Sequence, residues 1–166
     1  MKKLSFYIPL SLLGGIILCV VGCKPSNEVP AEYITIDNAE WAYTRPLLFN
    51  EKRDPLGSDI AAVELTLRHT QGYEYANLWL QVSYLSDDSV VSDTFNIPVA
   101  DDYGKWYGKN VGPIVTLTDT LMLKHVPDTA TCFELRHIMR VDKVHDIEQI
   151  GLRYFTITPQ NLPDAQ

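Results

Sequence analysis

Hydrophobic and polar residues alternate with a period of two over much of the chain between residues 61 and 154. Such alternation is typical of β-strands that face a core on one side and water on the other. Each run predicts one strand. The predicted inward-facing residues are Ala61, Val63, Leu65 and Leu67; Leu78, Leu80, Val82 and Tyr84; Val91, Phe95, Ile97 and Val99; Leu117, Leu121 and Leu123; Phe133, Leu135 and His137; and Ile150, Leu152 and Tyr154.

Turn residues separate these runs and indicate how the strands connect. Asp87-Asp88-Ser89 lies between two runs, which is typical of a hairpin. Short strands with regular turns predict an all-β fold, an antiparallel β-sandwich of immunoglobulin-like or jelly-roll-like type, with a barrel as the alternative. The one helical expectation is a short turn of helix within residues 142–150. Further turn signals are Gln71-Gly72, Pro127-Asp128 and the glycines Gly104, Gly108 and Gly112.

The N-terminus carries a different pattern. Lys2 and Lys3 precede an apolar stretch over residues 4–21, and Gly22-Cys23 follows it. A positive start, an apolar run and a small residue at the cut are the parts of a secretory signal peptide. Bacterial lipoproteins add an aliphatic residue three places before an obligatory cysteine, whose thiol takes a diacylglycerol before cleavage. We therefore predict removal of residues 1–22 and lipidation of Cys23.

A transmembrane anchor is the alternative interpretation of this stretch. Its length is near the lower limit of about 17–25 residues for a spanning helix. Pro9, Gly14 and Gly15 also weaken it as a membrane helix. Cys19 is not a second lipidation site, because Leu18 before it is too large for the peptidase.

The predicted lipidation site implies a cellular location and a division of the chain into segments. Lys24 stands where an aspartate commonly retains lipoproteins at the inner membrane. We therefore predict a cell-envelope protein held in the lipid bilayer through acylated Cys23, at the outer membrane, with the periplasmic face favoured. The predicted parts are a signal peptide over residues 1–22, a lipidated N-terminus and tether over 23–32, the β-sandwich domain over 33–157, and a flexible tail over 158–166.

The charge and the cysteine content limit which partners and crosslinks the chain can have. Acidic residues outnumber Lys and Arg by 21 to 14, for a net charge of −7, and cleavage of the signal peptide would remove two lysines and no acid. Such a surface repels nucleic acid and anionic headgroups, so the lipid must hold the membrane. After cleavage and acylation only Cys132 remains, which predicts no intrachain disulfide and a small strand residue at that position.

Residue sets with catalytic or metal-binding spacing are not visible in the sequence. The four histidines, none in ligand spacing, are interpreted as structural or surface residues; they are His69, His125, His137 and His145. The acidic pairs Asp87-Asp88 and Asp101-Asp102 give weak support for calcium, since turn aspartates usually bond their own backbone. Without a nucleophile elbow or a phosphate-binding glycine loop, we predict no enzyme, no catalytic residue, no cofactor and no metal.

The most unusual segment places aromatic rings among glycines and lysines at residues 100–109. Trp106 or Tyr107 could stack on a sugar face or anchor a protein partner, with Lys105 and Lys109 beside them. In the alternative, the rings plug one end of the sandwich core while the glycines supply positive φ. The four residues are the candidate partner or ligand contacts.

Several stretches share their order and spacing with a known family. They are Tyr75-Ala76-Asn77-Leu78-Trp79-Leu80; Asp93-Thr94; Ala100-Asp101 with Gly104-Lys105-Trp106-Tyr107-Gly108-Lys109; the segment from Phe133 to Met139-Arg140; and Ile147-Glu148-Gln149-Ile150-Gly151-Leu152-Arg153. With their placement after a lipid-modified cysteine, they resemble the GldH family of gliding-motility lipoproteins of Bacteroidota. The resemblance covers most of residues 33–157.

The resemblance implies an outer-membrane-associated lipoprotein needed for gliding, a process tied to the type IX secretion machinery. Members of this family have no recognised catalytic residue, so none is carried over. We expect a non-enzymatic component of gliding motility or of that secretion machinery, with other gliding or secretion proteins of the envelope as partners. The alternative is a glycan-binding β-sandwich lipoprotein with Trp106 and Tyr107 as its platform.

Overall fold

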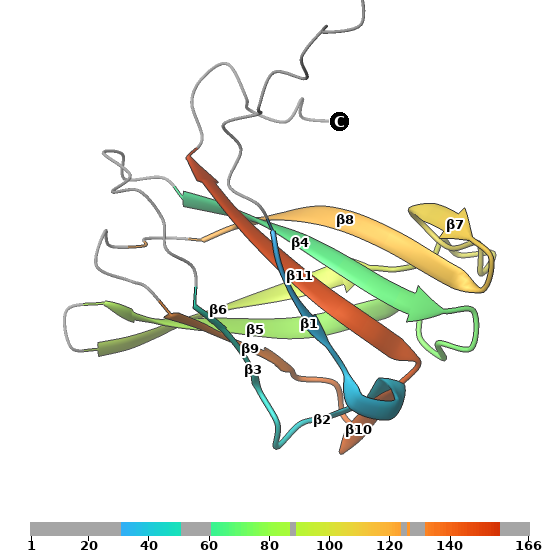
Figure 1. The fold of residues 1–166 in the computed structure, drawn as a ribbon, viewed down its shortest axis with the longest axis horizontal. Coiled ribbons are helices and arrows are strands. Elements are labelled where there is room, and N and C mark those ends of the chain that lie inside the picture. Colours follow the sequence, from blue (N-terminus) through green and yellow to red (C-terminus); the bar gives the residue numbers. More distant parts are fainter. Residues whose placement is uncertain (1–30, 51–60, 87–88, 124–125, 127–131, 157–166) are drawn as a thin grey trace, which may run out of the picture.

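The computed structural model shows two larger antiparallel sheets packed face to face (Figure 1). It describes residues 31–50, 61–86, 89–123, 126 and 132–156. The predicted all-β antiparallel sandwich is confirmed. Its elements are β1 (Glu32–Thr35), the short 3-10 helix η3 (Asp37–Ala39), β2 (Glu40–Ala42), β3 (Leu47–Asn50), β4 (Ala61–Thr70), β5 (Asn77–Ser86), β6 (Ser89–Pro98), β7 (Lys109–Val111), β8 (Ile114–Met122), β9 (Cys132–His137), β10 (Lys143–His145) and β11 (Ile147–Thr156).

One layer is a five-stranded sheet in the order β1-β11-β4-β8-β7. Its register places Ile150 of β11 opposite Leu67 of β4, and Leu67 opposite Leu117 of β8. Directly opposed residues in an antiparallel pair share a face. This row of aliphatic side chains therefore points together toward the second layer.

The second layer is a four-stranded sheet in the order β3-β9-β5-β6. The hairpin predicted at residues 87–89 joins β5 to β6, whose pairing runs from Asn77 opposite Pro98 to Ser86 opposite Ser89. A short two-stranded sheet of β10 and β2 lies below the ends of β1 and β11 in Figure 1.

The core lies between the layers and uses the alternate residues of both. The Phe133 ring of β9 lies 4.4 Å from the Tyr154 ring of β11, which joins the two sheets directly. Each fully buried Leu, Ile or Phe contributes about 1.5–3 kcal/mol. The largest fully buried side chains are Trp41, Phe49, Phe133, Leu65, Leu67, Leu78, Leu80, Ile97, Leu121, Leu135, Ile147 and Ile150.

Two residues follow the alternation although their residue type is unusual for the face they occupy. Asp93 occupies an inward position of β6 and is 5% exposed, with the Tyr84 hydroxyl 3.5 Å from its carboxylate. Trp79 occupies an outward position of β5 between buried Leu78 and Leu80, and it is 41% exposed. The odd or even position of a residue along the strand therefore decides its burial, even for a carboxylate that is buried and a tryptophan that is exposed.

The helical turn predicted within residues 142–150 is wrong. This segment forms β10 and the start of β11, separated by Asp146 at a φ of 66°. Val144 pairs with Trp41 of β2, so backbone groups that a helix would satisfy locally are satisfied across strands. Asp146 fixes the corner, because its backbone oxygen accepts from Thr70 N–H at 2.9 Å and its carboxylate accepts from the Thr70 hydroxyl.

Several sequence predictions fall on residues outside the described part. They are the signal peptide over residues 1–22, lipidated Cys23 and most of the tether, the flexible tail, Asp87-Asp88, His125 and Pro127-Asp128. Within the residues that the structure describes, no helix has the length and apolar character to cross a membrane.

Candidate functional site

The loop between β6 and β7 is held by its own backbone. Asp101 accepts hydrogen bonds through Oδ1 from the backbone N–H groups of Tyr103 and Lys105, at 3.0 and 2.9 Å. Ala100 and Trp106 form an antiparallel bridge across the base of the loop. The interpretation of Asp101 as a turn aspartate is therefore confirmed, since its carboxylate is engaged with local N–H groups.

Glycines supply the positive φ that this region requires, as predicted. Gly104, Gly108 and Gly112 have φ values of 79°, 90° and 62°. A Cβ atom at Gly108 would lie 2.3 Å from the backbone oxygen of Thr116 on β8, whereas nothing lies within 4 Å of the corresponding position at Gly104. Gly108 is thus required both by its backbone conformation and by close approach to β8.

Trp106 points back toward the core from this loop. Its half-buried ring lies 4.9 Å from the His69 ring, edge to face, and 6.3 Å from the Tyr73 ring, measured between centroids. It packs against the main hydrophobic cluster. This arrangement favours the core-plugging interpretation for Trp106 over a role as an open binding platform.

The other candidate contacts of the loop face outward. Tyr107 is 45% exposed, and Lys105 and Lys109 are exposed as well. Tyr103 is 96% exposed and had not been selected from the sequence. The structure therefore leaves Tyr107 and the two lysines accessible, whereas the Trp106 ring is half-buried.

His69 lies beneath Trp106 as a structural residue. It is fully buried, and its Nδ1 lies 2.8 Å from the carbonyl oxygen of Thr70, which assigns the proton to Nδ1. Its Nε2 has no hydrogen-bond partner within the described residues. Burial lowers the pKa of His69, against smaller opposing effects of the Thr70 carbonyl and Asp146. Burial likewise raises the pKa of the neighbouring Tyr73 well above its usual range.

The outer face of the four-stranded sheet carries a more open site. We call it the Trp79 groove. It has a volume of about 470 Å³, within the range typical of ligand pockets, about 300–1,000 Å³. Its lining consists of Tyr75, Trp79, Ile138, Met139, Arg140 and Val141.

The end of β9 shapes this groove. The last residue of β9 that pairs with β5 is His137, opposite Leu80. The chain then leaves the sheet. Ile138 N–H donates to the Trp79 carbonyl at 2.9 Å, and the Met139 sulfur accepts from Trp79 N–H at 3.3 Å. Two segments far apart in the sequence thus form opposite walls, residues 75–79 and residues 138–141.

Sequence stretches that carried the family resemblance meet around the Trp79 groove. Tyr75 and Trp79 of the first stretch supply one wall, and Met139-Arg140 supplies part of the other. The loop at residues 100–109 joins them at its base, because Val99 N–H and Ala100 N–H both donate to the Ala76 carbonyl, at 2.8 and 3.0 Å. Sequence reasoning did not select Trp79 as a functional residue. The usable signal was an aromatic ring on the polar face of an alternating strand.

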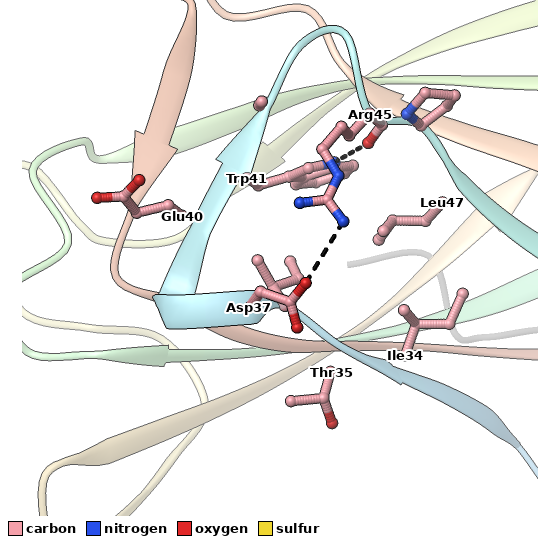
Figure 2. Close-up of a pocket in the computed structure, with 10 residues that line it drawn as sticks. Ile34, Thr35, Asp37, Glu40, Trp41, Arg45 and Leu47 are labelled. Carbon is pink, nitrogen blue, oxygen red and sulfur yellow. Dashed lines mark hydrogen bonds and ion pairs between the residues drawn. The ribbon is translucent and has the colours of Figure 1, made fainter.

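A second, smaller hollow lies where β1, η3 and β2 meet (Figure 2). Its volume is about 130 Å³, and Ile34, Trp41 and Leu47 provide apolar walls. Figure 2 shows the Arg45 side chain reaching toward Asp37, at an N–O distance of 3.4 Å. Trp41 Nε1 donates to the Arg45 carbonyl at 3.0 Å. This volume lies below the range of small-molecule pockets, about 300–1,000 Å³.

Two other titratable side chains lie close to Glu40 at the surface. Lys143 Nζ lies 2.7 Å from Glu40 and lowers the pKa of that carboxyl, while exposed His145 lies 3.6 Å from it. Solvent screens such exposed pairs, so they contribute little to stability. Cys132 is an exposed residue at the start of β9. The described residues contain no group of three or more His, Cys, Asp or Glu arranged to hold a metal ion.

These features define a class of protein. An antiparallel β-sandwich that follows a predicted lipoprotein signal sequence has the layout expected of a lipid-anchored envelope lipoprotein. The family model described as GldH lipoprotein matches residues 28–154. The chain therefore belongs to the GldH lipoprotein family, which groups it with the lipoproteins of gliding motility and implies membrane anchoring in the cell envelope. Searches of curated proteins and of solved structures give no match.

Proposed function

We propose that this lipoprotein is a non-enzymatic assembly or scaffolding component of the gliding apparatus or of the associated type IX secretion machinery. The observation that supports it is the GldH match over residues 28–154, which begins a few residues after the lipidation site at Cys23. A rigid sandwich with an open aromatic groove suits the holding of a partner. The proposed partners are other gliding or secretion proteins of the envelope.

The deciding experiment is deletion of the gene in its own host. We expect loss of spreading on agar in a gliding host and retention of type IX cargo inside the cell in any host. Crosslinking in living cells should recover motility or secretion proteins with the wild-type chain. Normal motility and normal secretion in the deletion strain would reject this function.

The proposed anchor is acylated Cys23 in the outer membrane, with the domain on the periplasmic face. The eight residues between Cys23 and Glu32 reach at most roughly 30 Å when extended, so the domain stays near the bilayer. Cys23→Ser should abolish palmitate labelling and move the protein into the soluble fraction. Protease added to intact cells should spare the wild-type protein, whereas cleavage would place it on the cell surface instead.

The domain boundaries belong to the same proposal. We propose a folded unit over residues 33–157 and a flexible tail over 158–166. Limited proteolysis of the purified protein should trim the tail and the tether while the unfolding transition stays unchanged. A drop in the midpoint of unfolding after trimming would show that the boundary is misplaced.

Glycan binding is the second candidate, and exposed loop tyrosines support it. Tyr103 and Tyr107 are 96% and 45% exposed, and aromatic faces of this kind stack on sugars. A glycan array probed with the wild-type protein and with a Tyr103→Ala, Tyr107→Ala variant tests it. Identical array patterns, or no bound glycan, would dismiss this alternative.

A further inference from the structure

We propose that the Trp79 groove is the docking site for an extended segment of a partner protein, with an apolar side chain on Trp79 and Met139 and an acidic side chain paired with Arg140. This inference rests on the proposed function, because it assigns the surface through which the scaffold holds its partner. Three observations support it: a strand edge covered by side chains in place of a partner strand, an unpaired arginine and the composition of the lining.

The first observation is the edge of β5. Ladder pairing with β9 stops at Leu80, and beyond it the only backbone bond that the structure describes from the departing chain is the one from Ile138 N–H to the Trp79 carbonyl, at 2.9 Å. Side chains and the departing chain occupy that edge instead. The Asn77 carbonyl accepts from the Tyr73 hydroxyl at 3.0 Å, and Trp79 N–H is bound by the Met139 sulfur at 3.3 Å.

A thioether is a weak hydrogen-bond acceptor. A peptide carbonyl that displaced the Met139 sulfur would give Trp79 N–H a stronger hydrogen bond. Met139 is unbranched and flexible, so it can move aside and still cover the incoming side chain. Addition of an extended segment to a strand edge, with main-chain bonds for affinity and a groove for side chains, is a recurrent mode of peptide recognition.

The second observation is the state of Arg140. Among the arginines in the part of the chain that the structure describes, it alone has no hydrogen-bond or ion-pair partner. The others bind Asp37 (Arg45), Gln149 (Arg68), Glu134 and the Tyr43 carbonyl (Arg136), and Glu64 (Arg153). Arg140 is exposed at the wall of the groove. In a chain with a net charge of −7, this cation selects an acidic group on the partner.

The third observation is the kind of side chain in the lining. Tyr, Trp, Met and Arg are the residues enriched in protein interfaces, and Trp, Tyr and Arg carry most of the binding energy at hot spots. The groove gathers one of each in Tyr75, Trp79, Met139 and Arg140. An acidic glycan could also use an aromatic ring and an arginine, but it would not extend the sheet along the edge of β5.

The test selects peptides on the lipidated mature protein in detergent micelles, with a random linear peptide library as the probe. We expect enriched sequences that carry a large apolar residue and an Asp or Glu at alternate positions, since alternate side chains share a face. Trp79→Ala and Arg140→Glu should each weaken binding of an enriched peptide by about tenfold or more. Tyr103→Ala and Arg68→Glu are the matched controls and should leave the affinity unchanged.

Backbone amide spectra of the same protein report the strand addition itself. A bound peptide should shift the Trp79 amide resonance downfield and slow its hydrogen exchange. Absence of any enriched peptide would overturn the proposal, as would enrichment that ignores Trp79→Ala and Arg140→Glu, or an unchanged Trp79 amide. Binding of oligogalacturonate where no peptide binds would reassign the groove to acidic glycans and would equally overturn it.

Complementation of the deletion strain separates this inference from the proposed function. A Trp79→Ala, Arg140→Glu variant that reaches wild-type levels in the membrane should fail to restore motility or secretion. Full restoration by that variant would overturn the docking site while leaving the proposed function intact. A deletion strain without a defect would reject the proposed function. The peptide measurements would still test whether the Trp79 groove is a docking site.

Discussion

Trp106 and Trp79 lie in contrasting surroundings. The exposure of each ring is the opposite of what the composition of its neighbouring residues indicates. Trp106 stands among glycines and lysines in a loop, yet its ring packs on His69 and Tyr73. Trp79 stands among aliphatic residues of a long strand, yet its ring is 41% exposed and lines a groove. Composition of the neighbourhood is therefore a poor guide to where either ring points.

The difference follows from backbone geometry. In a strand, successive side chains point to opposite faces, so burial of Leu78 and Leu80 forces Trp79 outward. In a loop no such parity exists, and the turn at Asp101 together with Gly104 aims Trp106 inward. A ring whose direction is set by parity can be assigned from sequence, whereas a ring whose direction is set by turn geometry cannot.

Truncation of each ring should give the largest measurable difference between the two tryptophans. Trp106→Ala should lower the free energy of unfolding by about 3 kcal/mol, because it empties a space between His69 and Tyr73. Trp79→Ala should lower it by less than about 1 kcal/mol, because the ring is largely at the surface. Urea unfolding followed by circular dichroism measures both. Equal losses would mean that the two rings are equally structural.

The next effect tests whether the loop is as rigid as the contacts indicate. Gly108→Ala should cost about 2–3 kcal/mol, since the residue has positive φ and its Cβ would meet the Thr116 carbonyl. Gly104→Ala, also at positive φ but in open space, is the matched control and should cost about 1 kcal/mol. If both variants lost the same amount, the close approach to β8 would carry no energetic weight.

The long strands were predictable from sequence because each is long enough to show its alternation. The runs ending in Leu67, Tyr84 and His137 placed correctly the inward residues from Val63 onward. The short strands β1, β2, β3, β7 and β10 were not predicted, since three or four residues are too few to reveal a period of two. Their structure depends on pairing with distant strands, as Val144 depends on Trp41.

The candidate site was less predictable than the fold. The glycine conformations and the turn at Asp101 were read correctly, because Gly and Asp have strong local preferences. The Trp79 groove was not, because it requires residues 75–79 to meet residues 138–141 across the sheet. Only the topology brings these two segments together.

Acid should destabilise the domain through two buried imidazoles, His69 beneath Trp106 and His137 beside the Trp79 groove. Burial lowers the pKa of both His69 and His137, so both rings are neutral when folded and take up protons more readily when unfolded. Stability is then full above the unfolded pKa of about 6.5 and falls as the pH drops toward the folded values. Urea unfolding from about pH 7.5 to about pH 5 should show this decline before most carboxylates titrate.

Replacement of a buried imidazole supplies the control for that decline. Burial lowers the pKa of His137, and the Trp41 backbone only partly opposes this effect. Neither ring nitrogen makes a hydrogen bond of good geometry within the described residues, and the ring packs on Trp41 and Tyr43. His137→Phe should therefore raise stability by about 1 kcal/mol at neutral pH and make the decline in acid shallower. A decline of unchanged steepness in a His69→Phe, His137→Phe variant would assign it to other groups.

The smallest effect concerns the sulfur that covers the edge of β5. Met139→Leu keeps the volume of the side chain but removes the acceptor of Trp79 N–H, and a thioether bond is weak, so global stability should change by less than about 0.5 kcal/mol. Hydrogen exchange at the Trp79 amide should quicken several-fold, while the Leu80 amide, which lies on the β6 side of the strand, should not change. Unaltered exchange at Trp79 would mean that the Met139 sulfur does not protect this edge, and that an incoming strand would have nothing to displace there.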